Sequence, residues 1–331
     1  MKKLFLFMGI VFLFSIASNS ETYSQSSGYK IAGIIDIGGE GGWDYLTVDE
    51  ASHRLYVSHS TKIHIIDLSK NEVIGEIGNL HGVHGIAPVS NAGKGYISNG
   101  KDSSVTVFDL RTFKVLTSVK ISGKNPDAII YEPFSKRVFV FNNGSGNAAA
   151  IDPSTDKIVG TIELGGAPEF AASDLKGKMY VNLEDKSEIC QFDPLNLKVL
   201  AAWSIAPVST PSGLALDREN NRLFSVGRNK MMAVIDAVNG KLITTAPIGG
   251  GVDGCAFDQK TKYAFSSNGE GNITVVKELS PGEFKVTDTV PTQKGARTIT
   301  VDQSNHKVYT IASIEGKDGK KSFGVLILES K

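Results

Sequence analysis

The stretch Lys94-Gly-Tyr-Ile-Ser-Asn99 decides the fold, because close relatives of it recur along the whole chain. Two near-copies are Arg54-Leu-Tyr-Val-Ser-His59 and Arg137-Val-Phe-Val-Phe-Asn142. Each copy precedes a second apolar run, and in five copies that run ends in an aspartate: Asp67, Asp109, Asp152, Asp193 and Asp236. The central aromatic residue recurs seven times at intervals of 40 to 44 residues, at Tyr56, Tyr96, Phe139, Tyr180, Phe224, Phe265 and Tyr309. The chain therefore consists of seven copies of one unit.

Each unit holds four short apolar or alternating runs separated by turn residues, with almost no helical period. Four strands in a unit of about 42 residues are typical of one blade of a β-propeller. The sequence thus predicts an all-β, seven-bladed β-propeller. The seventh unit ends after three strands, and the N-terminal stretch Ile31–Gly38 resembles the fourth strand of the other units. We expect this strand, within residues 29–39, to close the last blade, because an open sheet edge invites pairing with other chains.

The repeats resemble a known family of proteins. Tyr96-Ile-Ser-Asn99, together with Tyr56-Val-Ser-His59 and Phe139-Val-Phe-Asn142, is similar to the motif of the YVTN-repeat (YncE-like) family of bacterial β-propellers. Gly85-Ile-Ala87 and Gly213-Leu-Ala215 match the start of the first strand in that family's repeat. The resemblance covers the seven units and implies an exported propeller. It is specific for the fold and leaves the function open.

The N-terminus has the pattern of an export signal. Met1–Lys3 is a short basic start, Leu4–Ala17 is apolar, and small polar residues follow at Ser18 to Ser20. We predict a signal peptide over residues 1–20 and a single propeller domain over residues 21–331. The mature protein is then periplasmic or secreted. We expect it to be monomeric and to have no transmembrane segment after cleavage, because the apolar run is shorter than a bilayer span.

Composition limits the possible partners. The chain of 331 residues carries 35 basic and 35 acidic residues, and removal of the predicted signal peptide leaves a net charge of −2. Nucleic acid is therefore an unlikely partner, since nucleic-acid binders normally carry a basic surplus. Cys190 and Cys255 fall in different repeats, so we expect two buried free thiols even though export permits disulfides.

The start of the first strand in each unit supplies the most informative positions. In a propeller these innermost strands line a central channel, and their first residues form its mouth. Aligned on the repeat, these residues are Asp44, His84, Asp127, Glu169, Ser212, Asp253 and Arg297. The residues that end the second strands belong to the same side of the ring: His59, Asn99, Asn142, Asn182, Arg228 and Asn268. These residues other than Ser212 and Asn182, together with Trp43, form the predicted ligand-binding face.

Two positions near the mouth have alternative interpretations. Trp43 either stacks on a ligand at the channel rim or covers the apolar seam between the first and last blades. Arg297 is expected to pair with Asp253 or Asp44 across the mouth. The recurring aspartates, Asp67 among them, are too regular for catalysis, and we expect them to accept backbone N–H bonds in the following turns.

The sequence favours a non-enzymatic binding or scaffold protein that recognises a protein, peptide or carbohydrate at this face. The alternative is a hydrolase or lactonase acting on a sugar-derived substrate. Its candidate catalytic residues are His84, Asp127, Glu169 and Asp253. We expect no cofactor. We also expect no metal site, because sevenfold radial spacing holds the acidic side chains apart and a metal requires ligands that converge on one point.

Overall fold

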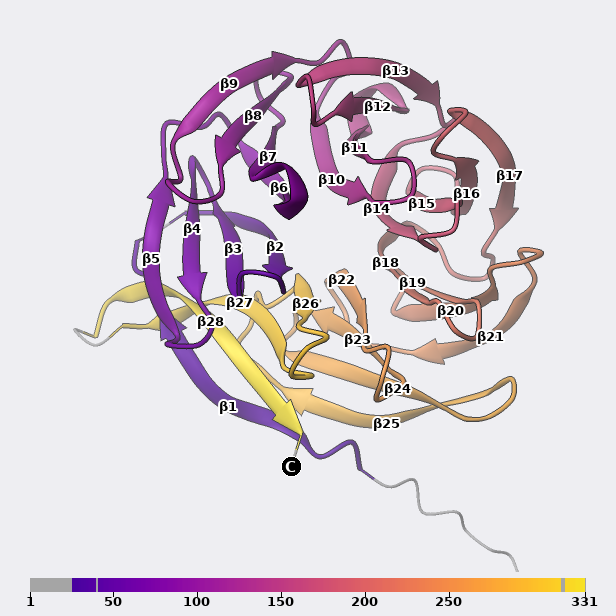
Figure 1. The fold of residues 1–331 in the computed structure, drawn as a ribbon. Coiled ribbons are helices and arrows are strands. Elements are labelled where there is room, and N and C mark those ends of the chain that lie inside the picture. Colours follow the sequence, from indigo (N-terminus) through magenta and orange to yellow (C-terminus); the bar gives the residue numbers. More distant parts are fainter. Residues whose placement is uncertain (1–25, 40, 317–318, 331) are drawn as a thin grey trace, which may run out of the picture.

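The computed structural model describes residues 26–39, 41–316 and 319–330, and within these it contains seven four-stranded antiparallel sheets arranged in a ring (Figure 1). The prediction of an all-β, seven-bladed β-propeller is confirmed. The predicted signal peptide, residues 1–20, lies outside the described residues. Among the described residues, no helix has the length and apolarity that crossing a membrane requires.

The strands follow the same order from the channel to the rim in every blade. The innermost strands are β2 (Trp43–Asp49), β6 (Val83–Val89), β10 (Pro126–Glu132), β14 (Pro168–Ser173), β18 (Pro211–Asp217), β22 (Val252–Phe257) and β26 (Ile299–Val301). The second strands are β3 (Arg54–His59), β7 (Lys94–Asn99), β11 (Arg137–Asn142), β15 (Met179–Leu183), β19 (Arg222–Gly227), β23 (Tyr263–Asn268) and β27 (Val308–Glu315).

The outer half of each blade completes the sheet. The third strands are β4 (Lys62–Asp67), β8 (Ser104–Asp109), β12 (Asn147–Asp152), β16 (Glu188–Asp193), β20 (Met231–Asp236), β24 (Asn272–Ser280) and β28 (Lys321–Ser330). The outermost strands are β5 (Glu72–Ile77), β9 (Val115–Lys120), β13 (Lys157–Glu163), β17 (Lys198–Ser204), β21 (Leu242–Pro247), β25 (Glu283–Pro291) and β1 (Tyr29–Asp36). Two short 3₁₀ turns are η1 (Ser90–Ala92) and η2 (Asn143–Ser145).

Strand β1 closes the ring as the sequence predicts. It pairs antiparallel with β28, with Tyr29 opposite Ser330 and Asp36 opposite Gly324. The last blade therefore takes its outermost strand from the N-terminal end and its other three strands from the C-terminal end. Tyr29 also packs edge-on against Phe265 of the sixth blade, with ring centroids 5.0 Å apart. The closing strand thus joins the seventh blade to its neighbour.

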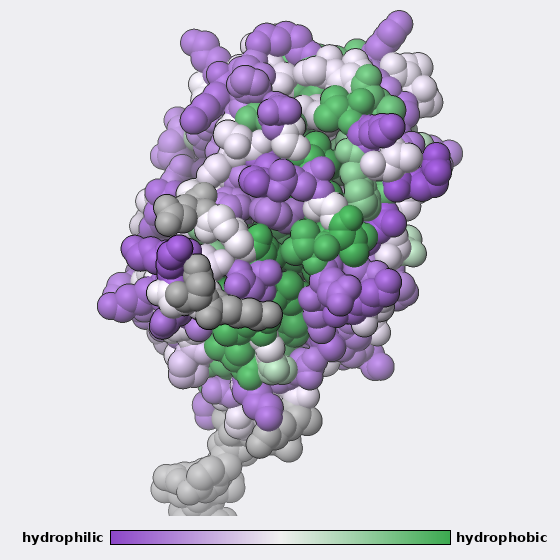
Figure 2. Space-filling view, turned by 90° about the vertical axis from the view of Figure 1, so that its left-hand side faces the viewer, coloured by the Kyte–Doolittle hydropathy of each residue, from purple (hydrophilic) through white to green (hydrophobic). Residues whose placement is uncertain are grey.

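The hydrophobic core lies between the faces of adjacent blades. One cluster joins Tyr96 and Val107 of the second blade to Val138 and Ile151 of the third. The seven recurring aromatic residues are all at most 3% exposed, which explains their periodic recurrence. At the rim, the outermost strands expose apolar side chains such as Val115 and Leu116, and a side view shows hydrophobic surface between hydrophilic residues (Figure 2).

Two further expectations are confirmed. The recurring aspartates accept backbone N–H groups of the following turns, as Asp109 does from Arg111 at 3.0 Å and from Thr112 at 2.7 Å. Cys190 and Cys255 are free and buried. Burial raises the pKa of the Cys190 thiol to about 12, so this thiol stays protonated and unreactive at neutral pH.

Candidate functional site

The innermost strands approach one another closely around the channel. A Cβ placed on Gly213 in β18 would overlap the backbone of Gly254 and Cys255 in β22, so only glycine fits there. Between β2 and β6, the Thr47 hydroxyl donates to the Ile86 carbonyl at 2.9 Å. Side chains at the starts of neighbouring strands are therefore brought within contact distance of one another. The structure places the predicted mouth residues at these starts.

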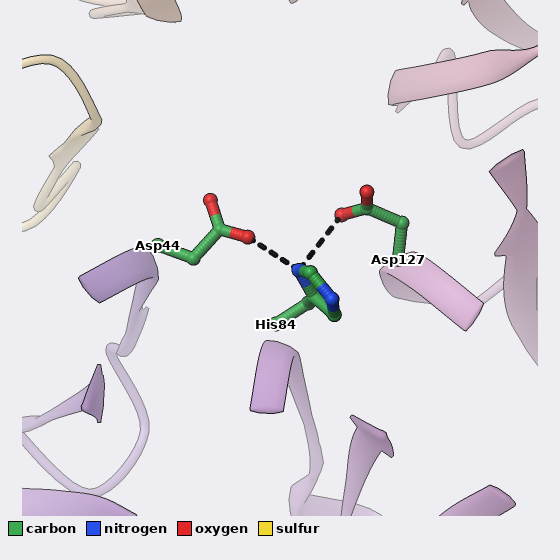
Figure 3. Close-up of side chains that lie close together, drawn as sticks. All are labelled: Asp44, His84 and Asp127. Atoms are coloured by element: carbon green, nitrogen blue, oxygen red, sulfur yellow. Dashed lines mark hydrogen bonds and ion pairs between the residues drawn. The ribbon is translucent and has the colours of Figure 1, made fainter. Parts of the chain in front are cut away.

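Three mouth residues converge. His84 Nδ1 lies 2.6 Å from Asp44 Oδ2 and 3.6 Å from Asp127 Oδ1. Figure 3 shows the two carboxylates pointing toward the imidazole from either side. One possible ligand atom of each residue lies within 4.8 Å of the others, a spacing that could hold a metal ion. The expectation that radial spacing keeps these side chains apart is therefore wrong for three neighbours, because β2, β6 and β10 pack so closely. We call Asp44, His84 and Asp127 the triad.

Negative charge accumulates around the triad. Burial raises the pKa of Asp127 to about 7, and the nearby charge of Asp44 adds to the effect. Burial also raises the pKa of Asp253, again with a contribution from Asp44. For His84, burial acts to lower the pKa, but the hydrogen bond to Asp44 and the charge of Asp127 outweigh it and raise the pKa. The proton on His84 thus supplies positive charge to a site rich in carboxylates.

Glu169 forms a second acidic pair with Glu184, which the sequence did not predict. Burial raises the pKa of Glu169 to about 9, with contributions from the charges of Asp127 and Glu184. Its carboxylate accepts a hydrogen bond from Asn143 Nδ2 at 2.9 Å. Glu184 also pairs with Arg228, N to O, at 3.1 Å. Glu184 lies one residue beyond β15, outside the aligned positions, so the repeat gave no signal for it.

Arg297 forms the closing side of the mouth. Its Nε donates to Asp253 Oδ2 at 2.9 Å, which confirms one of the two expected pairs. Its Nη2 donates to the Trp43 carbonyl at 3.0 Å, and its guanidinium lies 5.5 Å from the centre of the indole. Trp43 packs edge-on against Phe323 of the seventh blade at 4.8 Å. Trp43 therefore covers the seam between the first and last blades, as one of the two alternatives predicted.

Most residues at the ends of the second strands are buried. Among the predicted ligand-binding residues these are His59, Asn99, Asn142 and Asn268, with Asn182 alongside, each at most 2% exposed. Asn142 Nδ2 donates to Asn147 Oδ1 at 2.8 Å within its own hairpin. His59 Nδ1 lies 3.0 Å from His64 Nε2, and its ring packs on Phe323. The expectation that these side chains open onto the ligand-binding face is corrected, because they satisfy polar groups inside the blades. Arg228 of this set is exposed.

Sequence reasoning also missed the aromatic pair just below the mouth. Tyr45 in β2 stacks on Phe170 in β14, with ring centroids 4.3 Å apart and planes 28° apart. The first and fourth blades lie on opposite sides of the ring, so the two rings meet across the channel (Figure 1). A signal was present, since the five equivalent positions carry small residues: Gly85, Ala128, Gly213, Gly254 and Thr298.

Fold and site together define a seven-bladed propeller with an acid-rich channel mouth. No known protein-family model matches the chain. The chain is similar to YncE of Salmonella typhi, at 26% identity, and to YncE of Salmonella typhimurium, at 25%. Each alignment spans 149 residues, which are 43% of this chain and 42% of the relative's length, and both relatives are described as uncharacterized. The similarity agrees with the resemblance to YncE-like propellers found in the repeats.

Solved structures reproduce the fold. A chain of Kuenenia stuttgartiensis hydrazine synthase superposes with a TM-score of 0.72 at 16% identity, over 85% of this chain and 95% of that chain. The WD40 repeats of RRP9 give a TM-score of 0.75 at 8% identity, over 93% of this chain and 99% of that chain. At these identities the likeness is one of fold alone.

Proposed function

We propose that this protein is an exported, monomeric binding protein that holds a divalent transition-metal ion at the triad and presents it to an oxygen atom of a carbohydrate or peptide ligand. The observation that carries the proposal is the convergence of Asp44, His84 and Asp127. Two carboxylates and one imidazole suit zinc, manganese or iron, and three protein ligands leave further coordination positions open.

Charge balance supports the same proposal. Asp253 already has Arg297 as a partner, and Glu184 has Arg228. Within the triad, by contrast, the imidazole is the only cationic group among the described residues that contacts both aspartates. Two carboxylates facing one another in a partly buried site repel, and a divalent cation removes that repulsion. Metal and proton compete for His84 Nδ1, so the affinity for metal should fall as the pH is lowered.

Isothermal titration calorimetry of the chelator-treated mature chain with Zn²⁺ and Mn²⁺ tests the proposal. We expect saturable binding of one ion, weakened about 100-fold or more by Asp127→Asn and by His84→Gln. Glu163→Gln, which removes an exposed acid at the end of β13, is the matched control and should bind as the wild type does. Absence of saturable binding, or binding that both triad variants leave unchanged, would overturn the proposal.

A second candidate function is hydrolysis of a sugar-derived lactone. The specific observation in its favour is His84 held between two carboxylates, one of which, Asp127, has a pKa raised by burial to about 7. A group with such a pKa can act as a general base at neutral pH. Replacing Asp127, Glu169 and Asp253 together by their amides should abolish turnover. Lactone hydrolysis that survives the triple replacement would exclude this candidate.

A further inference from the structure

The channel continues below the Tyr45–Phe170 stack as an apolar chamber. Its volume is about 410 Å³, within the ~300–1,000 Å³ range of small-molecule sites. The walls are mainly apolar and include Ile86, Ile129, Phe141, Phe257 and Ile299. Tyr45 and Phe170 form its end toward the acidic mouth. A ligand in the chamber is therefore separated from the triad by two stacked rings.

The chamber opens toward the opposite side of the ring. There it joins a wider vestibule of about 810 Å³, since Thr47, Tyr131, Phe257 and Val301 line both spaces. The vestibule carries polar and charged groups that the chamber lacks: Glu50, Arg218, Gln259, Lys260 and His306. The channel is thus apolar in its depth and polar at this second mouth.

Arg218 is the cation best placed at this second mouth. It follows β18 directly, is partly buried, and donates from Nε to the Ser173 carbonyl at 3.2 Å. Burial lowers the pKa of its guanidinium, and the more distant charges of Glu50 and Asp174 only partly oppose this. Among the described residues no carboxylate forms an ion pair with Arg218, whereas Lys262 nearby pairs with Asp217 at 3.2 Å. Its outer nitrogens keep donors for an anion.

We propose that the chamber binds a small amphipathic carboxylate, which enters through the second mouth. The apolar or aromatic tail would lie among Ile86, Ile129 and Phe141, and the carboxylate would meet the guanidinium of Arg218. Arginine recognises carboxylates through paired N–H donors, and burial strengthens such a contact. The acidic mouth repels an anion from the other side, and the stacked rings obstruct that route.

Titration calorimetry with octanoate, in the presence of EDTA, tests the proposal. The wild-type mature chain should bind octanoate and should bind 1-octanol about tenfold more weakly, because the alcohol lacks the charged group. Arg218→Gln should weaken octanoate binding about tenfold or more and leave octanol binding unchanged. Lys157→Gln, which removes one exposed positive charge at the start of β13, is the matched control.

A second variant tests the position of the tail. Ala171 lines both the chamber and the vestibule, and Ala171→Trp should fill the space and abolish binding of both probes while Arg218 is kept. Thermal melts of each variant establish that it is folded. The proposal is overturned if octanoate does not bind, if it binds no better than octanol, or if Ala171→Trp binds it normally. Because EDTA is present throughout, this outcome is independent of metal binding at the triad.

Discussion

Both ends of the innermost strands carry aspartates, but the surroundings of these aspartates differ. Asp127, at the start of β10, faces Asp44 and His84 at the mouth. Asp258, directly after β22 at the other end, accepts N–H groups from Lys260 at 2.9 Å and from Thr261 at 3.3 Å. Asp258 is 0% exposed and also pairs with His306 Nδ1 at 3.0 Å.

Structural and functional acids in this protein differ in their partners and not in their burial. An acid that receives several N–H donors is stabilised in its charged form by the fold itself. An acid that faces other acids is destabilised in its charged form, and a cation or a proton relieves the repulsion. The acids at the ends of the innermost strands therefore stabilise the ring, whereas the acids at their starts are suited to bind a cation.

The largest expected effect follows from removing a structural acid. Asp258→Ala should lower the free energy of unfolding by about 3 kcal/mol or more, because it leaves His306 and two partly buried turn amides without their acceptor. Chemical denaturation measures the change. Asp127→Asn, at the start of β10, should lower the free energy of unfolding in EDTA by less than about 1 kcal/mol, or should raise it. A change of this size is typical of a surface substitution. Equal losses of unfolding free energy in the two variants would contradict the distinction between structural and functional acids.

A smaller effect, of opposite sign, is expected at Glu169. Its pKa is raised by burial and nearby acids from 4.5 to about 9, so between these values the folded protein holds a proton that the unfolded chain releases. Stability is therefore lost as the pH rises through this window, and the loss is complete above pH 9. Glu169→Gln should gain nothing near pH 4 and should be more stable than the wild type at pH 9. A stability difference that does not vary with pH would contradict the assignment.

The smallest effect concerns the side-chain amide of Gln303, which links the seventh blade to the sixth at the end of the innermost strands away from the acidic mouth. Gln303 Nε2 donates to the Phe257 carbonyl at 2.8 Å, and its Oε1 accepts from the backbone of Gln259 at 2.9 Å. Gln303→Ala removes both bonds and should lower the free energy of unfolding by about 1 kcal/mol. Chemical denaturation beside Gln293→Ala, at a glutamine whose Oε1 has no hydrogen-bond partner, provides the control. Equal stability of the two variants would show that the hydrogen bonds of Gln303 do not stabilise the fold.

The fold could be predicted almost completely from the sequence, because each blade is a local unit whose buried aromatic recurs with the period. The closing strand was also predictable, since residues 31–38 resemble the strand that the last unit lacks. The site was predictable only as a set of equivalent positions. Alignment placed Asp44, His84 and Asp127 at the mouth but gave no information on how far each side chain reaches.

The remaining features depend on contacts that the repeat does not encode. The Tyr45–Phe170 stack joins blades that are not neighbours in the chain, and a periodic pattern describes only a unit and its copies. The burial of Asn142 follows from an amide bond to Asn147 across a hairpin, so a polar residue at a strand end was mistaken for a surface residue. Polar character alone does not distinguish a binding group from a satisfied internal one.

The pairing of β1 with β28 sets the order of events during folding. Strand β1 precedes the strands of the first six blades in the chain, and its partner β28 follows them. Six blades are contiguous in the chain and can form one after another, whereas the seventh requires both ends. We therefore expect ring closure to be the final step, so that β1 must stay unpaired until then. If the chain is exported unfolded, as proposed above, its ring closes only after β28 has crossed the membrane.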